Sequence, residues 1–209
     1  MKFRVIQDTF GVEELPHGLF YEFPWGLRFN LSNVSTSTGT RHLERFLDSL
    51  DRAKSITHAF LADSEKVTVL FSRLGPEKPV PAMNRAVNQL DDIGFDSARL
   101  NYLGAIKQGE DDYEDWRYQH WYSCHLSNEL PEIDKLLWNC VAQDMGVQPY
   151  AEWGSIYLAD LQKQMIVHVY DDRGMDVIAM DKETIKPFYS DLNSWLLEYD
   201  RKAMDQKFS

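Results

Sequence analysis

Three strand-length apolar runs follow one another closely in the C-terminal part of the chain, and they limit the possible folds more than any other feature. The runs span residues 155–161, 165–170 and 175–180. In the first two, apolar residues fill alternate and intervening positions, which is typical of strands covered on both faces. The sequence therefore predicts a β-sheet that has these strands near its centre.

Four more segments have the pattern of strands. At 26–31 the apolar residues Leu27, Phe29 and Leu31 alternate with Arg28 and Asn30, a period of two. The other three segments span 67–71, 99–106 and 116–126.

Helices are predicted where apolar residues recur every three or four positions. Such stripes run through 41–60, 81–93, 131–145 and 182–203. Pro187 lies inside the last stripe, so a kink or restart is expected near Lys186. Because the sequence has no long linker, residues 1–209 are expected to form one α/β or α+β domain, with a mixed sheet of about six or seven strands packed by about four helices.

The charge of the chain limits its partners. It contains 33 acidic residues against 22 Lys and Arg, a formal net charge of −11. Phosphate contacts are made by clustered Lys and Arg, so direct binding of nucleic acid is not expected. Hydrophobic residues make up 44% of the chain, which is too apolar for a disordered protein.

The sequence also indicates a compartment. The first ten residues are followed by no apolar run of the kind that a secretory signal contains. No stretch approaches the roughly 18 apolar residues of a membrane span. The protein is therefore expected to be cytoplasmic, without membrane contact, and to keep Cys124 and Cys140 as thiols.

An acidic run is the first candidate binding site. Five acids occupy six positions, and aromatic residues follow directly; the candidate residues are Glu110, Asp111, Asp112, Glu114, Asp115, Trp116, Tyr118 and Trp121. Most charge runs are solvated loops. Here the acids could steer a basic protein partner over long range, and the aromatic side chains could anchor it.

A second candidate lies between the last two apolar runs. Asp171, Asp172 and Asp176, with His168 on the preceding strand, could gather a hard divalent cation. The same residues also suit a hairpin, in which the aspartates bond to the turn backbone and Gly174 supplies a left-handed conformation. The hairpin is the favoured interpretation, and no cofactor is expected.

The chain contains none of the strong catalytic motifs: no P-loop, no Gly-x-Gly-x-x-Gly, no His-Glu-x-x-His, no Gly-x-Ser-x-Gly and no Cys-x-x-Cys. Cys140 falls in the apolar stripe of a predicted helix, as expected for an inert core thiol. The sequence therefore favours a non-enzymatic protein.

Several blocks resemble an uncharacterised family, the domain-of-unknown-function family numbered 3885. The blocks are 19–21, 26–29, 156–157 and 166–179, together with Asn193, Trp195, Leu196, Tyr199, Asp200 and Arg201. The resemblance implies no activity or catalytic residues. In size and charge the chain is also similar to immunity proteins, which block toxic and usually basic nuclease domains.

These observations favour a non-enzymatic acidic protein that neutralises a basic bacterial toxin by electrostatic capture and occlusion. Two alternatives stay open: a small metal-assisted hydrolase that uses Asp171, Asp172, Asp176 and His168, and an interaction module without a toxin partner. The sequence sets neither the partner nor the oligomeric state.

Overall fold

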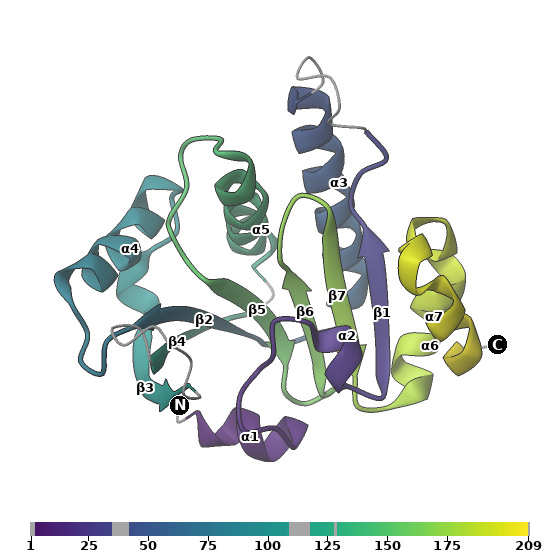
Figure 1. Ribbon diagram of the computed structural model, residues 1–209, viewed down its shortest axis with the longest axis horizontal. Coiled ribbons are helices and arrows are strands. Elements are labelled where there is room, and N and C mark those ends of the chain that lie inside the picture. Colours follow the sequence, from purple (N-terminus) through teal and green to yellow (C-terminus); the bar gives the residue numbers. More distant parts are fainter. Residues whose placement is uncertain (1–2, 35–41, 109–117, 128, 209) are drawn as a thin grey trace.

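Seven strands form one sheet in the computed structural model (Figure 1). The structure describes residues 3–34, 42–108, 118–127 and 129–208. Across the sheet the strands lie in the order β1-β7-β6-β5-β2-β4-β3. Their bounds are β1 Trp25–Asn30, β2 Val67–Gly75, β3 Asn101–Lys107, β4 Tyr118–Leu126, β5 Ser155–Asp160, β6 Met165–Val169 and β7 Gly174–Ala179.

Helices surround this sheet. The described α-helices are α1 Arg4–Phe10, α2 Leu19–Glu22, α3 His42–Phe60, α4 Pro81–Asp92, α5 Leu130–Met145, α6 Lys182–Asp191 and α7 Arg201–Phe208. The short 3-10 helices are η1 Ser97–Arg99, η2 Asn193–Trp195 and η3 Glu198–Asp200. Among these helices, none combines the length and the apolar character that crossing a membrane requires.

The predicted single α/β domain with six or seven strands is confirmed. The sheet is not mixed, however, because all six described strand pairings are antiparallel. Turns too short for a crossover join β5 to β6 and β6 to β7, which forces those strands to run in opposite directions. More helices form than the four predicted, since α1, α2 and α7 are too short for a clear periodic stripe.

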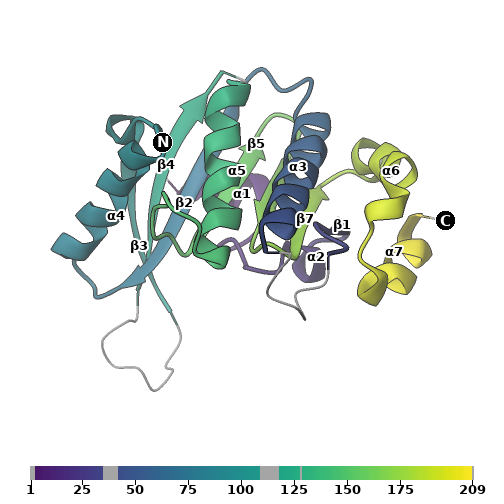
Figure 2. The same ribbon diagram turned by 90° about the horizontal axis from the view of Figure 1, so that it is seen from above.

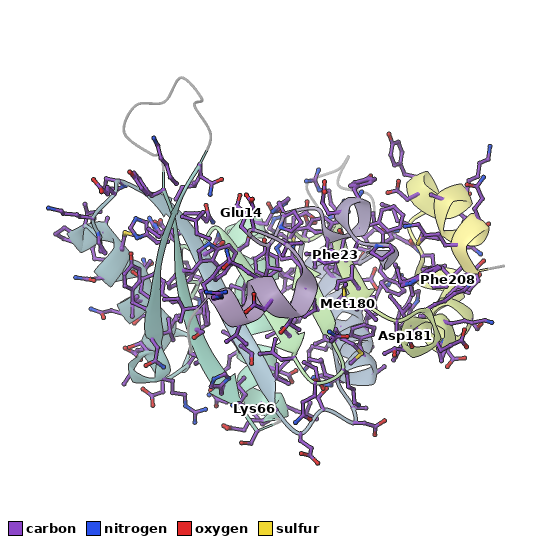
Figure 3. All side chains as sticks on the ribbon, turned by 90° about the horizontal axis from the view of Figure 1, so that it is seen from below. Glu14, Phe23, Lys66, Met180, Asp181 and Phe208 are labelled. Atoms are coloured by element: carbon purple, nitrogen blue, oxygen red, sulfur yellow. The ribbon has the colours of Figure 1, made fainter. Side chains whose placement is uncertain are left out.

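The two faces of the sheet carry separate apolar clusters. Along β2, Val69 and Phe71 point to one face and Leu70 points to the other. α3 and α5 lie side by side against the first face (Figure 2). On the opposite face α1 lies across the sheet, as Figure 3 shows from its own side. Both faces of the central strands are therefore buried, as their continuous apolar sequence predicts.

Two buried side chains fasten the chain between α1 and α2 to this second face. The Tyr157 hydroxyl donates to the backbone oxygens of Leu15 (3.4 Å) and Pro16 (3.2 Å). His168 Nδ1 donates to the backbone oxygen of His17 at 2.9 Å. The two rings stack with centroids 4.2 Å apart, so neighbouring strands hold three consecutive carbonyl groups in place.

The C-terminal segment does not form the single helix predicted for 182–203. α6 passes through Pro187 and ends at Asp191, so the break falls after the proline and not near Lys186. The chain then runs along the outer edge of β1, where Leu197 N donates to the backbone oxygen of Arg28 at 2.8 Å. A bridge also pairs Phe29 with Leu196. Pairing with β1 thus replaces the helical hydrogen bonds at this point.

Candidate functional site

The acidic run predicted to bind a partner joins β3 to β4. Glu110, Asp111, Asp112, Glu114, Asp115 and Trp116 lie outside the described residues. Tyr118, the first residue of β4, is half-buried and pairs with Lys107 and Gly75. Their role in partner binding stays a prediction.

The prediction that Trp121 anchors a partner at the surface is wrong. Only 1% of it is exposed, and its ring packs against Phe3 with centroids 4.6 Å apart. Tyr157 lies on its other side, with a centroid separation of 5.9 Å. Strand alternation places Trp121 on the face that α1 covers, so it contributes to the core beneath that helix.

The structure supplies an exposed aromatic residue that the sequence analysis did not single out. Tyr102 on β3 is 46% exposed, and its hydroxyl lies 2.9 Å from Nδ1 of the buried His120. His120 Nε2 lies 2.6 Å from the backbone oxygen of Pro76, which can only accept. Nε2 therefore donates to Pro76, and Nδ1 forms a hydrogen bond with the Tyr102 hydroxyl. Tyr102 is therefore bonded to the buried His120 although almost half of it is exposed. Its position in a strand of alternating pattern was the sequence signal that could have identified it.

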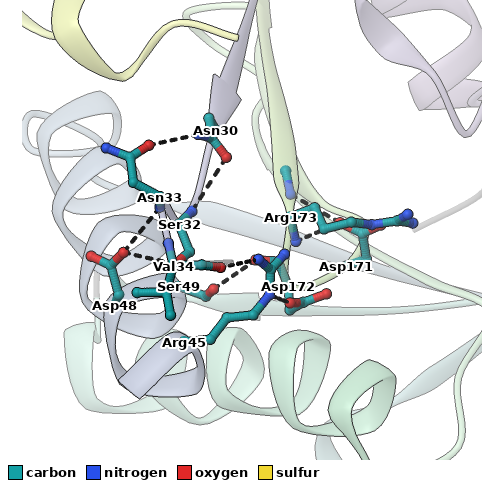
Figure 4. A network of polar contacts seen from close by, with 11 residues as sticks. Asn30, Ser32, Asn33, Val34, Arg45, Asp48, Ser49, Asp171, Asp172 and Arg173 are labelled. Carbon is teal, nitrogen blue, oxygen red and sulfur yellow. Dashed lines mark hydrogen bonds and ion pairs between the residues drawn. The ribbon is translucent and has the colours of Figure 1, made fainter. Parts of the chain in front are cut away.

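Asp171 closes the β6–β7 turn. Its Oδ1 accepts from the backbone N–H groups of Arg173 (2.8 Å) and Gly174 (2.9 Å), and its Oδ2 accepts from Arg173 Nε at 2.7 Å (Figure 4). Gly174 is not left-handed, contrary to expectation. Glycine is required there because the Tyr170 side chain occupies the space that a Cβ would take. This arrangement supports the hairpin interpretation.

Asp172 points the other way, toward α3. Arg45 Nε donates to its carboxylate, and Ser49 Oγ donates to its backbone oxygen at 2.6 Å (Figure 4). Asp144 of α5 lies nearby, and burial and the neighbouring Asp172 raise the pKa of its carboxyl. The turn is thus fixed to α3 by side chains more than 100 residues away in sequence.

Asp176 on β7 and His168 on β6 lie opposite each other in the sheet but form hydrogen bonds with different partners. Asp176 Oδ1 accepts from Arg28 Nε and Oδ2 accepts from Phe20 N, both at 3.0 Å. Burial raises the pKa of this carboxyl despite these two donors. Burial also lowers the pKa of His168 to about 3, so its imidazole is neutral.

The structure does not bring the four candidate metal ligands together into one cluster. Asp171, Asp172 and Asp176 each bond to a different arginine, and His168 Nδ1 is committed to His17. Within the described part of the chain, no three His, Cys, Asp or Glu residues are arranged to hold a metal ion.

A pocket of about 450 Å³ opens where β2, β4 and β5 meet. Its lining residues are His17, Arg73, Leu74, Gln119, Glu152, Trp153, Gly154 and Ser155. The four candidate metal ligands are not among them. Arg73 donates to the backbone oxygen of Glu152. This pocket therefore contains none of the proposed metal ligands, and its arginine is already hydrogen-bonded within the chain.

Residues from distant parts of the chain converge at Arg28. Its Nη1 donates to the Tyr21 hydroxyl (2.5 Å) and to Asp200 Oδ2 (3.0 Å), and the Tyr21 hydroxyl in turn donates to Asp200. The guanidinium also lies over the rings of Tyr21 and Tyr170. This network joins α2, β1, β7 and η3, and it collects residues from the separate blocks that suggested a family resemblance.

The fold and these contacts define an α/β protein with an antiparallel sheet and a partly buried polar network around Arg28. The family model described as "Domain of unknown function (DUF3885)" matches residues 3–200, and the chain belongs to that family. A relative from Bacillus subtilis (strain 168), "Uncharacterized protein YnaE", is 35% identical over 48 residues. That match covers 23% of this chain and 22% of the relative. No solved structure matches the chain.

Proposed function

We propose that this protein is a non-enzymatic binding protein whose acidic surface captures a basic protein partner in the cytoplasm, with a toxin domain as the kind of partner it neutralises. The proposal is supported chiefly by how the chain uses its arginines. Of the nine described arginines, eight form ion pairs within the chain: Arg4, Arg28, Arg45, Arg52, Arg73, Arg99, Arg173 and Arg201.

Internal pairing leaves the excess carboxylates as the dominant charge that a partner meets. With a net charge of −11, the field of the molecule attracts cationic surfaces and repels nucleic acid. Such steering accelerates association and weakens as salt screens it. Direct blocking of the partner's active surface would then neutralise it without any bond being made or broken.

The acids at 110–115 are proposed to steer the partner, and Tyr102 is proposed to anchor it in place of Trp121. Tyr102 belongs to β3, the strand that leads into the acidic run. Rigid tyrosines contribute much of the binding energy at protein interfaces because little side-chain entropy is lost when they are covered.

The test uses a partner defined by gene position. The C-terminal domain of a large secreted protein encoded directly upstream is mixed with the full chain, and association is followed by stopped flow at several salt concentrations. In one variant, Asp111, Asp112 and Glu114 are changed to Lys. A control variant changes Glu183, Asp191 and Glu198 to Lys, which alters the net charge equally at the α6–η3 end.

We expect the first variant to associate at least about tenfold more slowly, with a flatter salt dependence. The control should keep most of the wild-type rate. Equal rates for both variants would show that the acidic run is not the docking surface. A complete lack of binding would reject the toxin partner and favour an interaction module.

A further inference from the structure

The two edge strands of the sheet, β1 and β3, differ in whether another segment of the described chain pairs with them. At β1 the C-terminal segment covers the edge through the Leu197–Arg28 hydrogen bond and the Phe29–Leu196 bridge. At β3, the other edge, no backbone hydrogen bond leads from 102–107 to any described residue outside the strand ladder. One edge is therefore closed by the chain itself, and at the other the outward N–H and C=O groups have no backbone partner among the described residues.

β3 is well held on its inner side. Its register with β4 runs from Asn101 opposite Ser123 to Lys107 opposite Tyr118. Leu103 and Ile106 pack against the apolar cluster beneath α1, and Tyr102 stacks on His120. None of the residues of β3 is fully buried. The strand is thus an ordered template whose outer side has no backbone partner within the described part of the chain.

Pairing of two copies through this edge is disfavoured. Between Tyr102 and Gly104 the register shifts in a β-bulge, and Gly104 has φ +122°. A bulge is a device that protects edge strands from indiscriminate pairing. Two chains of charge −11 would also repel each other. A strand from a positively charged molecule would instead be attracted by the net negative charge of the chain.

We propose that the open edge of β3 receives an extended basic segment of the partner as an eighth strand. This inference rests on the proposed function for the charge of the partner and adds the mode of recognition. Main-chain hydrogen bonds to Gly104–Lys107, beyond the bulge, would supply affinity. Tyr102 on one face and Leu103 and Ile106 on the other would contact alternate side chains of the added strand.

The experiment uses the full-length, ¹⁵N-labelled protein and three blocked octapeptides as probes. (Lys-Val)₄ is basic and can form a strand. (Lys-Pro)₄ carries the same charge but cannot form a β-ladder, because alternate amide donors are missing. (Glu-Val)₄ can form a strand but is acidic. Amide exchange and chemical shifts are followed for β3 and, as an internal control, for the covered edge strand β1.

We expect saturating (Lys-Val)₄ to slow exchange at alternate β3 amides by about tenfold or more, with the other two peptides changing it less than about twofold. Amides of β1 should not respond. Equal binding of (Lys-Val)₄ and (Lys-Pro)₄ without protection of β3 would overturn strand addition and leave electrostatic capture standing. Loss of binding for all three peptides would overturn strand addition, and the association test with the neighbouring gene product would then decide the proposed function separately.

Discussion

Arg28 on β1 and Asp176 on β7 are direct neighbours across the sheet, and their side chains form an ion pair of 3.0 Å. Asp176 is fully buried, and the same carboxylate accepts the Phe20 N–H at the start of α2. Gly18, which precedes α2, has no side chain that could cap that helix. One aspartate on the sheet therefore neutralises an arginine and caps a helix.

Replacing Asp176 by Asn should destabilise the protein by about 1–3 kcal/mol, because the mostly buried Arg28 guanidinium then keeps only Asp200 as a charged partner. Urea unfolding measures the change. Asp171→Asn is a matched control in the nearby turn, where Arg173 is largely exposed and the expected cost is smaller. Equal costs for the two variants would show that burial of the Arg28 pair is not the decisive factor.

His168 should make stability depend on pH. Burial lowers its pKa from 6.5 to about 3, so the folded protein binds this proton less readily than the unfolded chain does. The stability contributed by neutral His168 is complete above pH 6.5 and is lost as pH falls toward 3, by about 1.4 kcal/mol per pH unit.

His168→Gln should reduce that slope in denaturant unfolding followed from pH 7 to pH 4. The control is His42→Gln, at an exposed position at the start of α3, which should retain the wild-type dependence of unfolding free energy on pH. An unchanged slope in His168→Gln would mean that other groups cause the acid sensitivity.

Asp144→Asn should stabilise the protein at neutral pH. Because burial and Asp172 raise the pKa of Asp144, its ionised form costs stability above that pKa, and the cost disappears as pH falls below the ordinary value of 3.8. The side chain is largely exposed, so solvent screening limits the gain to about 0.5 kcal/mol or less.

Asp91→Asn provides a control of opposite sign. Hydrogen bonds from Ser97 lower the pKa of Asp91, so removing its charge should destabilise the protein at neutral pH. Thermal unfolding at pH 7 and pH 3 compares the two variants. A change in the same direction for both would contradict the assigned electrostatic environments.

Trp121 and Tyr102 should separate stability from partner binding. Trp121→Ala removes a buried ring and is expected to cost about 3–5 kcal/mol of unfolding free energy. Tyr102→Ala should cost less, since half of its side chain is already exposed, and should weaken binding of the neighbouring gene product. If Tyr102→Ala binds as wild type does, the anchor lies elsewhere.

Much of the architecture was predictable from local pattern. The central strands β5, β6 and β7 and the helices α3, α4 and α5 lie close to their predicted positions, because each has several residues of consistent period. α2 was not predicted, since four residues are too few for a periodic signal. The end of α6 was also missed, because pairing of Leu197 with Arg28 overrides local helix preference.

The candidate site was less predictable. Alternation along 116–126 places Trp121 on one face of a strand, but it does not state that α1 covers that face. The aspartates at 171–176 form a compact acidic group in sequence, yet Arg45 and Arg28 divide them between different parts of the fold. Proximity in sequence therefore suggested a cation site, whereas in the folded chain these aspartates pair with three different arginines.

The sequence by itself determined the α/β class, most of the strands and helices, and the surplus of negative charge, because these follow from local periodicity and from composition. The tertiary structure decided which sheet edge has no backbone partner among the described residues, which aromatic residues are exposed, and which arginine pairs with each aspartate of the β6–β7 region. The physical reason is the range of the interactions: the bonds from Arg45 to Asp172 and from Arg28 to Asp176 join residues 127 and 148 positions apart, and such contacts exist only after the layers have packed together.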